Sequence, residues 1–189
     1  MALDSESRWR LVRKLKAQPV EPAGENIIRE AKLEDLREVA EIYNYYILNS
    51  VITFDVEEMK LDEWESKFDY LKGLKLPFIV AESPTGQILG FAYLGPWRQK
   101  AAYRRTAENT IYLKPSAKGK HIGTALMKEL LARGKKAGLR EVVAVISDKG
   151  TEASLAMHKK FGFEEHGRLA KVGFKLGKWV GVIMLQKSL

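Results

Sequence analysis

A short basic turn that contains two glycines has residue types suited to binding a phosphorylated ligand. The turn follows an apolar segment at residues 110–113 and precedes a helix-like segment at residues 124–136. Backbone N–H groups at a helix start have no acceptor inside the helix, and the helix dipole favours negative charge there. We therefore predict a phosphate-binding turn, with a purely structural loop as the alternative. Its six residues are Lys118, Gly119, Lys120, His121, Ile122 and Gly123.

Two common phosphate-binding motifs are missing from the sequence. It contains no G-x-x-x-x-G-K-[ST] motif, and no G-x-G-x-x-G motif at the opening strand of a βαβ unit. The sequence therefore disfavours a nucleotide-hydrolysing or dinucleotide-binding enzyme.

The residue types limit the other chemistry that the chain can perform. The sequence has no cysteine, which excludes disulfides, cysteine-ligated metals and thiol nucleophiles. Its three histidines, at positions 121, 158 and 166, lack the spacing of a metal site, so we expect no bound metal. Catalysis must then use carboxylates, hydroxyls, lysines or a single histidine.

Positive charge is concentrated in the C-terminal part of the chain. Residues 1–113 hold 16 Lys and Arg against 18 Asp and Glu, whereas residues 114–189 hold 16 against 6. This basic excess begins beside the glycine turn and suits a polyphosphate ligand or a nucleic acid. The sequence has no zinc-finger spacing, aromatic RNA-recognition motif or basic heptad repeat, so we expect no nucleic-acid partner.

Length and hydropathy indicate one globular domain with an N-terminal extension. A chain of 189 residues with 46% apolar content is of a size that forms a single core. No apolar run is long enough to span a bilayer, and the first residues lack the apolar core of a secretory signal. We expect a cytoplasmic protein without a membrane partner. Residues 1–26 are predicted to form a partly flexible extension with a short helix over 5–16, and residues 27–189 form the domain.

Hydrophobic periodicity predicts alternating strands and helices in this domain. A turn at residues 83–86 joins two strands into an antiparallel hairpin, and Gly162 is placed to end a helix. The order β-α-α-β-β-β-α-β-α-β-β indicates a mixed α/β sheet with helices on both faces. Helices are predicted at 33–48, 61–71, 124–136 and 154–161. Strands are predicted from 27 and at 78–81, 88–94, 110–113, 141–146, 163–168 and 180–185, with a glycine-rich connection at 173–177.

This order and the central turn resemble the GCN5-related N-acetyltransferase (GNAT) superfamily. Its cofactor motif is [QR]-x-x-G-x-[GA] after the fourth strand, and here Lys118 replaces Gln or Arg while His121 replaces a glycine. The resemblance implies the GNAT fold, an α/β (α+β) fold with a mixed, mostly antiparallel central sheet, and acetyl-CoA as cofactor. Compared with glycine, His121 has fewer accessible backbone conformations, and therefore fewer that direct its backbone amides toward a pyrophosphate.

Four ordered segments narrow the resemblance over residues 27–189. They read GPWR at 95–98, TAENTIYL at 106–113, MHKKFGF at 157–163 and VGFKLGKW at 172–179. Together with Tyr103 they resemble the phosphinothricin and methionine sulfone N-acetyltransferase family. The resemblance implies acetylation of the α-amino group of a small amino acid or analogue, such as phosphinothricin, methionine sulfoximine or methionine sulfone. It also implies a homodimer.

The family resemblance assigns catalytic roles to two residues. Glu108 matches the general base that removes a proton from the substrate ammonium, with a solvated strand-end glutamate as the alternative. His158 matches a position near the thiol, where it protonates the leaving thiolate or orients the substrate, with a structural helix histidine as the alternative. Glu108, Thr110 and Tyr112 share one strand face if no bulge intervenes.

The resemblance also implies a cofactor site and an amino-acid site. Thr151 in addition suits a helix N-cap. Asp55 lies where an arginine can stand beside the pocket phenylalanine, and an acidic side chain there repels a phosphinate, so we do not expect phosphinothricin itself as natural substrate. The expected cofactor-binding residues are Tyr112, Leu113, Lys118, Gly119, Lys120, His121, Ile122, Gly123, Thr124, Thr151 and Ser154. The expected substrate-binding residues are Phe54, Arg98, Lys100, Tyr103 and Thr110.

The sequence thus predicts an acetyl-CoA-dependent N-acetyltransferase that transfers acetyl directly to a small-molecule amine in a ternary complex. One alternative is a GNAT enzyme acting on a protein N-terminus or a polyamine, although Arg98 and Lys100 do not suit a polyamine. The other is a basic nucleic-acid-binding or cofactor-sensing module without enzyme activity.

Overall fold

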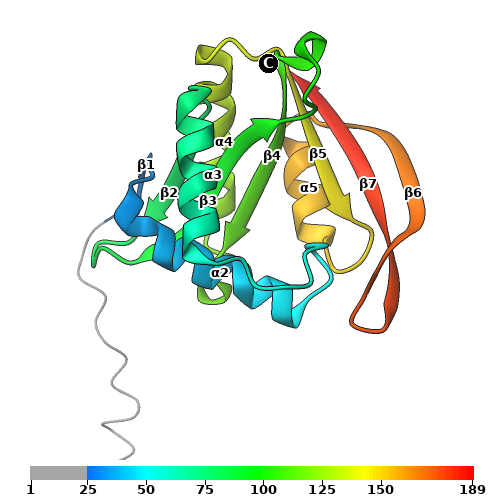
Figure 1. Cartoon of the computed structure of the whole chain (residues 1–189), viewed down its shortest axis with the longest axis horizontal. Helices are drawn as coiled ribbons and strands as arrows, with labels where there is room; N and C mark the ends of the chain where they lie inside the picture. The colour runs from blue at the N-terminus through cyan, green and yellow to red at the C-terminus, as the bar shows by residue number, and fades with distance from the viewer. Residues whose placement is uncertain (1–24) are drawn as a thin grey trace, which may run out of the picture.

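The computed structural model describes residues 25–189 (Figure 1). The predicted helix over residues 5–16 lies outside the described residues. Apart from short 3-10 helices, the described elements follow the predicted order, which is confirmed. They are β1 (Ile27–Glu30), η1 (Leu33–Asp35), α2 (Leu36–Asn49), α3 (Leu61–Gly73), β2 (Phe78–Glu82), β3 (Ile88–Pro96), η2 (Ala101–Tyr103), β4 (Thr106–Leu113), η3 (Pro115–Ala117), α4 (Ile122–Lys136), β5 (Glu141–Ser147), α5 (Glu152–Lys160), β6 (Glu164–Lys175) and β7 (Lys178–Ser188).

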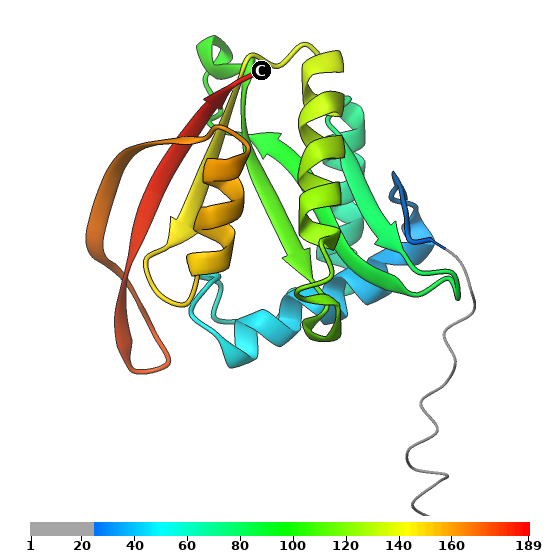
Figure 2. The same cartoon turned by 180° about the vertical axis from the view of Figure 1, so that it is seen from behind.

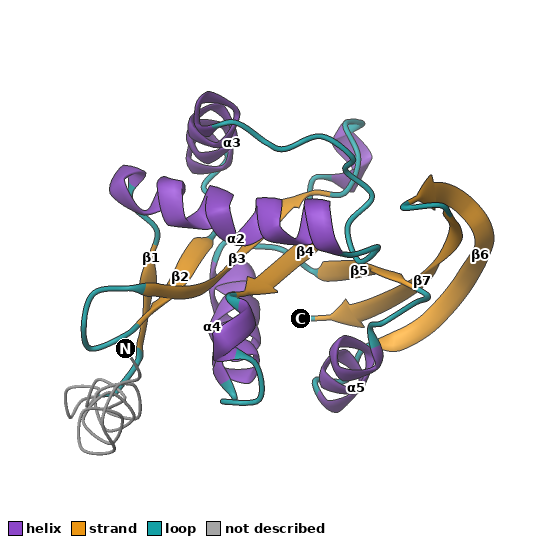
Figure 3. Cartoon of the chain, turned by 90° about the horizontal axis from the view of Figure 1, so that it is seen from below, coloured by secondary structure: helices purple, strands orange, loops and turns teal. Residues whose placement is uncertain are grey.

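A seven-stranded sheet forms the centre of the described domain, with strand order β1-β2-β3-β4-β5-β7-β6. Neighbouring strands are antiparallel except β4 and β5, which run parallel. Helices α2 and α3 cover one face of the sheet, and α4 and α5 cover the other (Figure 3). The predicted mixed, mostly antiparallel sheet with helices on both faces is therefore confirmed.

Strands β4 and β5 separate soon after they pair. Beyond the paired residues, β4 continues alongside β3 and β5 alongside β7, so the two strands diverge (Figures 1 and 2). We call this divergence the β4–β5 opening. Among the described strands none pairs with the backbone groups of β4 that face this opening, and polar groups of a ligand can pair with them. The paired residues are Thr106 with Glu141, Ala107 with Val142 and Glu108 with Val143.

The register of β4 against β3 is uninterrupted from Ala107 to Leu113. Because β4 has no bulge against β3, its side chains alternate strictly between the two faces of the sheet. Tyr112 packs into the core under α2 and α3, whereas Ile111 packs against the core under α4. Glu108 and Thr110 therefore share the face of Tyr112, and Asn109 lies on the opposite face.

Apolar side chains at helical spacing hold α2 on the sheet. Leu36, Val39, Tyr43 and Ile47 are buried in one core with Trp64 of α3. Full burial of each such side chain contributes about 1.5–3 kcal/mol. This packing fixes α2 across β3 and β4, so the segment that follows α2 begins beside the β4 face that carries Glu108.

Several strand boundaries differ from the prediction, above all at the start of β4 and around the turn between β6 and β7. β4 begins at Thr106 rather than Thr110, which places Glu108 inside the strand. The predicted connection at 173–177 is wrong, because β6 runs to Lys175 and β7 begins at Lys178. Leu176 and Gly177, with φ of 49° and 72°, alone form the turn. Two residues with positive φ match the twist of a two-residue hairpin, so the glycine at 173 lies in a strand and not in the turn.

Candidate active site

The turn at residues 118–123 opens α4, as predicted. Gly119 has φ of 75°, and His121 has φ of 61° and ψ of 7° as the N-cap of the helix. Both residues are therefore in the left-handed region, which costs a non-glycine residue about 1–2 kcal/mol. His121 thus adopts the conformation that a glycine adopts freely, in spite of its side chain.

The first turn of α4 presents free backbone amides. The helical hydrogen bonds begin with the Ala125 N–H, which donates to the His121 carbonyl at 3.1 Å. The N–H groups of Ile122, Gly123 and Thr124 find no acceptor within the described residues. Together with the helix dipole they form a site with the chemistry of a phosphate cradle.

The start of α4 packs closely against the end of β4 and against α5, beside the β4–β5 opening. A Cβ on Gly123 would lie 3.4 Å from Met157 Sδ and 3.5 Å from Leu113 Cδ1. Leu113 ends β4 and Met157 belongs to α5, so α4, α5 and the end of β4 meet at Gly123. The side chain of Lys118 lies over the Tyr46 ring, 5.0 Å from its centroid. The predicted cofactor residues from 113 to 124 are therefore contiguous around the end of the opening.

Glu108 lies at the point where β4 and β5 separate, opposite Val143 in their last pair. Its half-buried carboxylate has no hydrogen-bond or ion-pair partner in the described part of the chain. Burial raises the pKa of the Glu108 carboxyl above its usual range. A carboxylate that is partly desolvated and free of protein partners can accept a proton from a bound amine.

The other two predicted residues on this strand face differ in their surroundings. Thr110 is half-buried beside Glu108 on the face toward α2. The Tyr112 ring packs against Tyr43 and Tyr46, with ring centroids 5.0 and 5.3 Å apart. Burial raises the pKa of the Tyr112 hydroxyl. Tyr112 is therefore an aromatic core residue in this structure, and the Tyr46 hydroxyl donates to the carbonyl of Leu113 at 2.6 Å.

His158 lies on the opposite face of β4 from Glu108. It is buried in α5, and its ring meets Phe163 edge-on at 5.0 Å between centroids. Its Nδ1 lies 2.8 Å from the Ser154 carbonyl oxygen, and its Nε2 lies 2.9 Å from Asn109 Nδ2. Burial lowers the pKa of the His158 imidazole. The structure does not place His158 and Glu108 in direct contact.

The segment that carries Phe54 is held from two sides. Tyr43 of α2 donates a hydrogen bond to Asp55 Oδ2 at 2.6 Å, and its hydroxyl lies 2.9 Å from Thr53 Oγ1. From the β6–β7 hairpin, buried Lys175 Nζ donates to the Thr53 carbonyl at 3.0 Å. Burial lowers the pKa of the Lys175 ammonium. The exposed Phe54 ring lies so close to Gly173 that an added Cβ would be 2.6 Å from it.

Three predicted substrate residues lie on the connection between β3 and β4. Arg98, Lys100 and Tyr103 are exposed. The Arg98 guanidinium lies over the Trp97 ring at 5.2 Å, and within residues 25–189 no side-chain hydrogen bond or ion pair engages any of the three. They are thus free to meet a ligand, and they precede the strand that carries Glu108.

The two predicted cofactor residues at the start of α5 have structural contacts. Thr151 is the N-cap residue, as predicted, but its side chain makes no capping bond. Its hydroxyl instead donates to the Ser147 carbonyl at 2.5 Å and ties the helix start to the end of β5. Ser154 Oγ lies 3.4 Å from His158 Nδ1.

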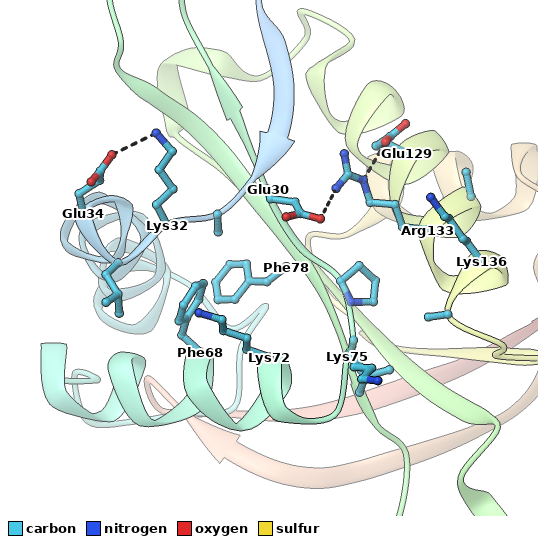
Figure 4. Close-up of a pocket in the computed structure, with 16 residues that line it drawn as sticks. Glu30, Lys32, Glu34, Phe68, Lys72, Lys75, Phe78, Glu129, Arg133 and Lys136 are labelled. Atoms are coloured by element: carbon cyan, nitrogen blue, oxygen red, sulfur yellow. Dashed lines mark hydrogen bonds and ion pairs between the residues drawn. The ribbon is translucent and has the colours of Figure 1, made fainter.

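A separate groove lies between β1, β2, α3 and the end of α4 (Figure 4). Its volume is about 1090 Å³, and ion pairs of Arg133 with Glu30 and Glu129 line one side. None of the predicted site residues lines this groove. Within residues 25–189 no cluster of three or more His, Asp or Glu side chains is placed to hold a metal, and no described helix is long and apolar enough to cross a membrane.

Residues 36–163 match the model of the acetyltransferase (GNAT) family. The chain therefore belongs to this family, and it is an N-acetyltransferase by class. A phosphinothricin N-acetyltransferase of Alcaligenes faecalis is 35% identical over 164 residues, which cover 86% of this chain and 82% of that protein. An L-methionine sulfoximine/L-methionine sulfone acetyltransferase of Pseudomonas paraeruginosa is 32% identical over 162 residues, covering 86% and 94%.

A solved structure resembles the described domain closely. The crystal structure of a GNAT superfamily phosphinothricin acetyltransferase from Sinorhizobium meliloti, in complex with AcCoA, gives a TM-score of 0.84 at 36% identity. The match covers 87% of this chain and 88% of that one. The fold and the family implied by the sequence motifs are therefore confirmed.

Proposed function

We propose that the protein acetylates the α-amino group of a small amino acid or amino-acid analogue, with acetyl-CoA as acetyl donor, by direct transfer in a ternary complex. The observation that carries this proposal is the position of Glu108. Its half-buried carboxylate, which no other described residue pairs with, lies where β4 and β5 separate, and helix amides without an acceptor in residues 25–189 lie beyond the other end of β4.

The residues present fit the chemistry of acetyl-CoA. Free N–H groups at the start of α4 suit its pyrophosphate, and the surrounding basic residues add positive charge. The bound cofactor supplies an acetyl group activated as a thioester. The proposed cofactor-binding residues are Tyr112, Leu113, Lys118, Gly119, Lys120, His121, Ile122, Gly123, Thr124, Thr151 and Ser154.

Glu108 is the proposed general base. Its raised pKa keeps the carboxylate basic enough to take the proton of a substrate ammonium, directly or through a water. The neutral amine then forms the new N–C bond while the C–S bond breaks, and the proton that the nitrogen loses in becoming an amide is passed to the thiolate, directly or through a water. The sequence contains no cysteine for an acyl-enzyme, which agrees with direct transfer.

Arg98 and Lys100 are the proposed partners of the substrate carboxylate, with Phe54, Tyr103 and Thr110 lining the pocket. Both cations are exposed and unpaired in the described chain, so their charges are available to an anion. Asp55 adds a negative charge beside Phe54. We therefore propose substrates with uncharged side chains, like methionine sulfone, ahead of phosphinothricin.

We also propose a homodimer that acts in the cytoplasm. β6 is an edge strand, and large apolar side chains are exposed along the β6–β7 hairpin, which a second copy can cover. Light scattering coupled to gel filtration would show twice the chain mass, and a monomer would refute the dimer. These exposed residues are Leu169, Val172, Phe174, Leu176 and Trp179.

Turnover of acetyl-CoA with a panel of amines, measured by thiol release, tests the function. We expect release with methionine sulfone or methionine sulfoximine, and slower release with phosphinothricin. Turnover only with peptide N-termini or polyamines would replace the proposed substrate class. No turnover with any amine, together with salt-sensitive binding of nucleic acid, would refute the enzyme itself.

A further inference from the structure

Asn109 is a polar residue of β4 on the face covered by α4 and α5, and it has none of the proposed catalytic or binding roles. It follows Glu108 directly, so it is the first residue of β4 beyond the pairs with β5. Only 9% of it is exposed, and it lies on the face toward α4 and α5. Its neighbours on that face of the strand are apolar: Ala107 is a buried core residue, and the partly buried Ile111 packs against the same core. A carboxamide in such surroundings needs specific partners.

One side of the carboxamide is fixed by His158. The Ser154 carbonyl can only accept a hydrogen bond, so the His158 Nδ1 that lies 2.8 Å from it carries the proton. Since burial disfavours the charged imidazole, Nε2 is then unprotonated and accepts the hydrogen bond from Asn109 Nδ2 at 2.9 Å. Both ring nitrogens of His158 are therefore engaged.

The other side of the carboxamide has no partner among the residues that the structure describes. Asn109 Oδ1 is buried and makes no hydrogen bond within the described residues. An unsatisfied buried acceptor is costly, and the bond to His158 prevents the amide group from turning this oxygen elsewhere without breaking that bond. The oxygen is thus held ready for a donor that the chain itself does not provide.

We propose that Asn109 binds the pantetheine arm of acetyl-CoA, with Oδ1 accepting a hydrogen bond from one of the amide N–H groups of that arm. His158 is then a positioning residue, which holds the carboxamide and does not protonate the thiolate. The inference rests on the proposed function, because it places the arm in the β4–β5 opening, between the phosphate turn and Glu108.

Calorimetric binding of two probes tests this role. Acetyl-CoA carries the pantetheine arm, whereas adenosine 3′,5′-bisphosphate lacks it. Asn109→Leu removes the acceptor at similar volume, and His158→Phe keeps the ring shape without its nitrogens. Loss of one neutral hydrogen bond corresponds to about threefold to tenfold weaker binding. We expect that loss for acetyl-CoA in both variants and unchanged binding of the bisphosphate.

Matched controls separate this role from a structural one. Asn49→Leu changes an exposed asparagine, which bonds only the Tyr45 carbonyl, and should leave both affinities unchanged. The double variant Asn109→Leu/His158→Phe removes both polar partners, so neither is left unsatisfied and the melting temperature should stay at the wild-type value. Its loss of acetyl-CoA affinity should equal that of each single variant, because both act through the same hydrogen bond. If Asn109→Leu does not fold, Asn109→Ala replaces it.

Several results would overturn the inference. Wild-type affinity of Asn109→Leu for acetyl-CoA would do so, and so would an equal loss for the bisphosphate or additive losses in the double variant. Weaker binding of free CoA with unchanged binding of acetyl-CoA would assign Oδ1 to the thiol. A changed pH profile of turnover in His158→Phe would make His158 a proton donor. Failure of the wild-type protein to bind acetyl-CoA would instead refute the proposed function.

Discussion

At the scale of single residues, the burial that makes Glu108 suitable as a general base also lowers the stability of the fold when its carboxyl ionises. Burial raises its pKa, so the fold favours its neutral form over the carboxylate. The stability that the neutral carboxyl contributes is fully present below the unfolded-state pKa, near 4.5, and is lost as the pH rises through the raised folded-state pKa. Ionisation of the Glu108 side chain therefore destabilises the fold, and the same ionised form is the one that can accept a proton.

Glu108→Gln tests both consequences. We expect turnover near neutral pH to fall about 100-fold to 10,000-fold, with acetyl-CoA affinity nearly unchanged. The melting temperature should rise at pH 7, and the gain over wild type should vanish near pH 4, where both side chains are neutral. Steady-state kinetics and thermal denaturation at the two pH values measure this. Wild-type turnover would remove Glu108 from the mechanism.

His121 is the other residue whose conformation has a measurable consequence. Its left-handed backbone is costly for a residue with a Cβ, and more so for a β-branched one. His121→Gly should therefore leave the free energy of unfolding within about 1 kcal/mol of wild type, because relief of strain offsets the flexibility of glycine. His121→Val should lower it by about 1–2 kcal/mol. Urea denaturation of the pair checks this, and equal stability would contradict it.

At the scale of elements, the β6–β7 hairpin positions the segment that carries Phe54. Lys175 bonds the Thr53 carbonyl, and Gly173 leaves space for the Phe54 ring. The glycine is needed here for close approach, because its φ is not positive. A substitution at Gly173 in β6 therefore acts on Phe54, which is distant in the sequence but adjacent in space.

Gly173→Ala should displace the Phe54 ring without unfolding the hairpin. An added Cβ would lie 2.6 Å from the ring, and an exposed ring can rotate away at small cost. We expect a severalfold higher KM for the amino acid with acetyl-CoA binding unchanged. Gly73→Ala, at a helix end with no atom within 4 Å of the new Cβ, is the matched control. An unchanged KM would remove Phe54 from the substrate pocket.

Local patterns predict the elements of this domain better than the contacts between them. Apolar spacing identifies α2, and the position of the turn before α4 follows from its glycines. The bond between Asn109 and His158 joins residues 49 positions apart, and no local pattern indicates it. Lys175 is buried and bonds the Thr53 carbonyl, 122 positions away in the sequence, which no local pattern indicates either. The β6–β7 hairpin is longer than its glycines indicate, because Gly173 lies in the strand beside the Phe54 ring and not in a turn.

At the scale of the whole molecule, the uneven charge should affect cofactor binding. The basic excess of the sequence begins at the turn that is proposed to bind a polyphosphate. Raising the salt concentration from about 0.05 M to about 0.5 M should raise the KM for acetyl-CoA several-fold and leave kcat nearly constant. Steady-state kinetics at each salt concentration, with the amine kept saturating, measure both constants. A kcat that falls with a constant KM would contradict electrostatic attraction.

The β4–β5 opening has a mechanical consequence for the domain. Within residues 25–189, three strand-paired positions join the β1–β4 part of the sheet to the β5–β7 part. A ligand lying in the opening would add a cross-link between the two parts, since each could contribute polar backbone groups to it. At 100 times its dissociation constant, such a ligand stabilises the folded chain by about 2.7 kcal/mol. Substrate supply would thereby set the rigidity of the sheet, and the unliganded protein would be the more easily digested form.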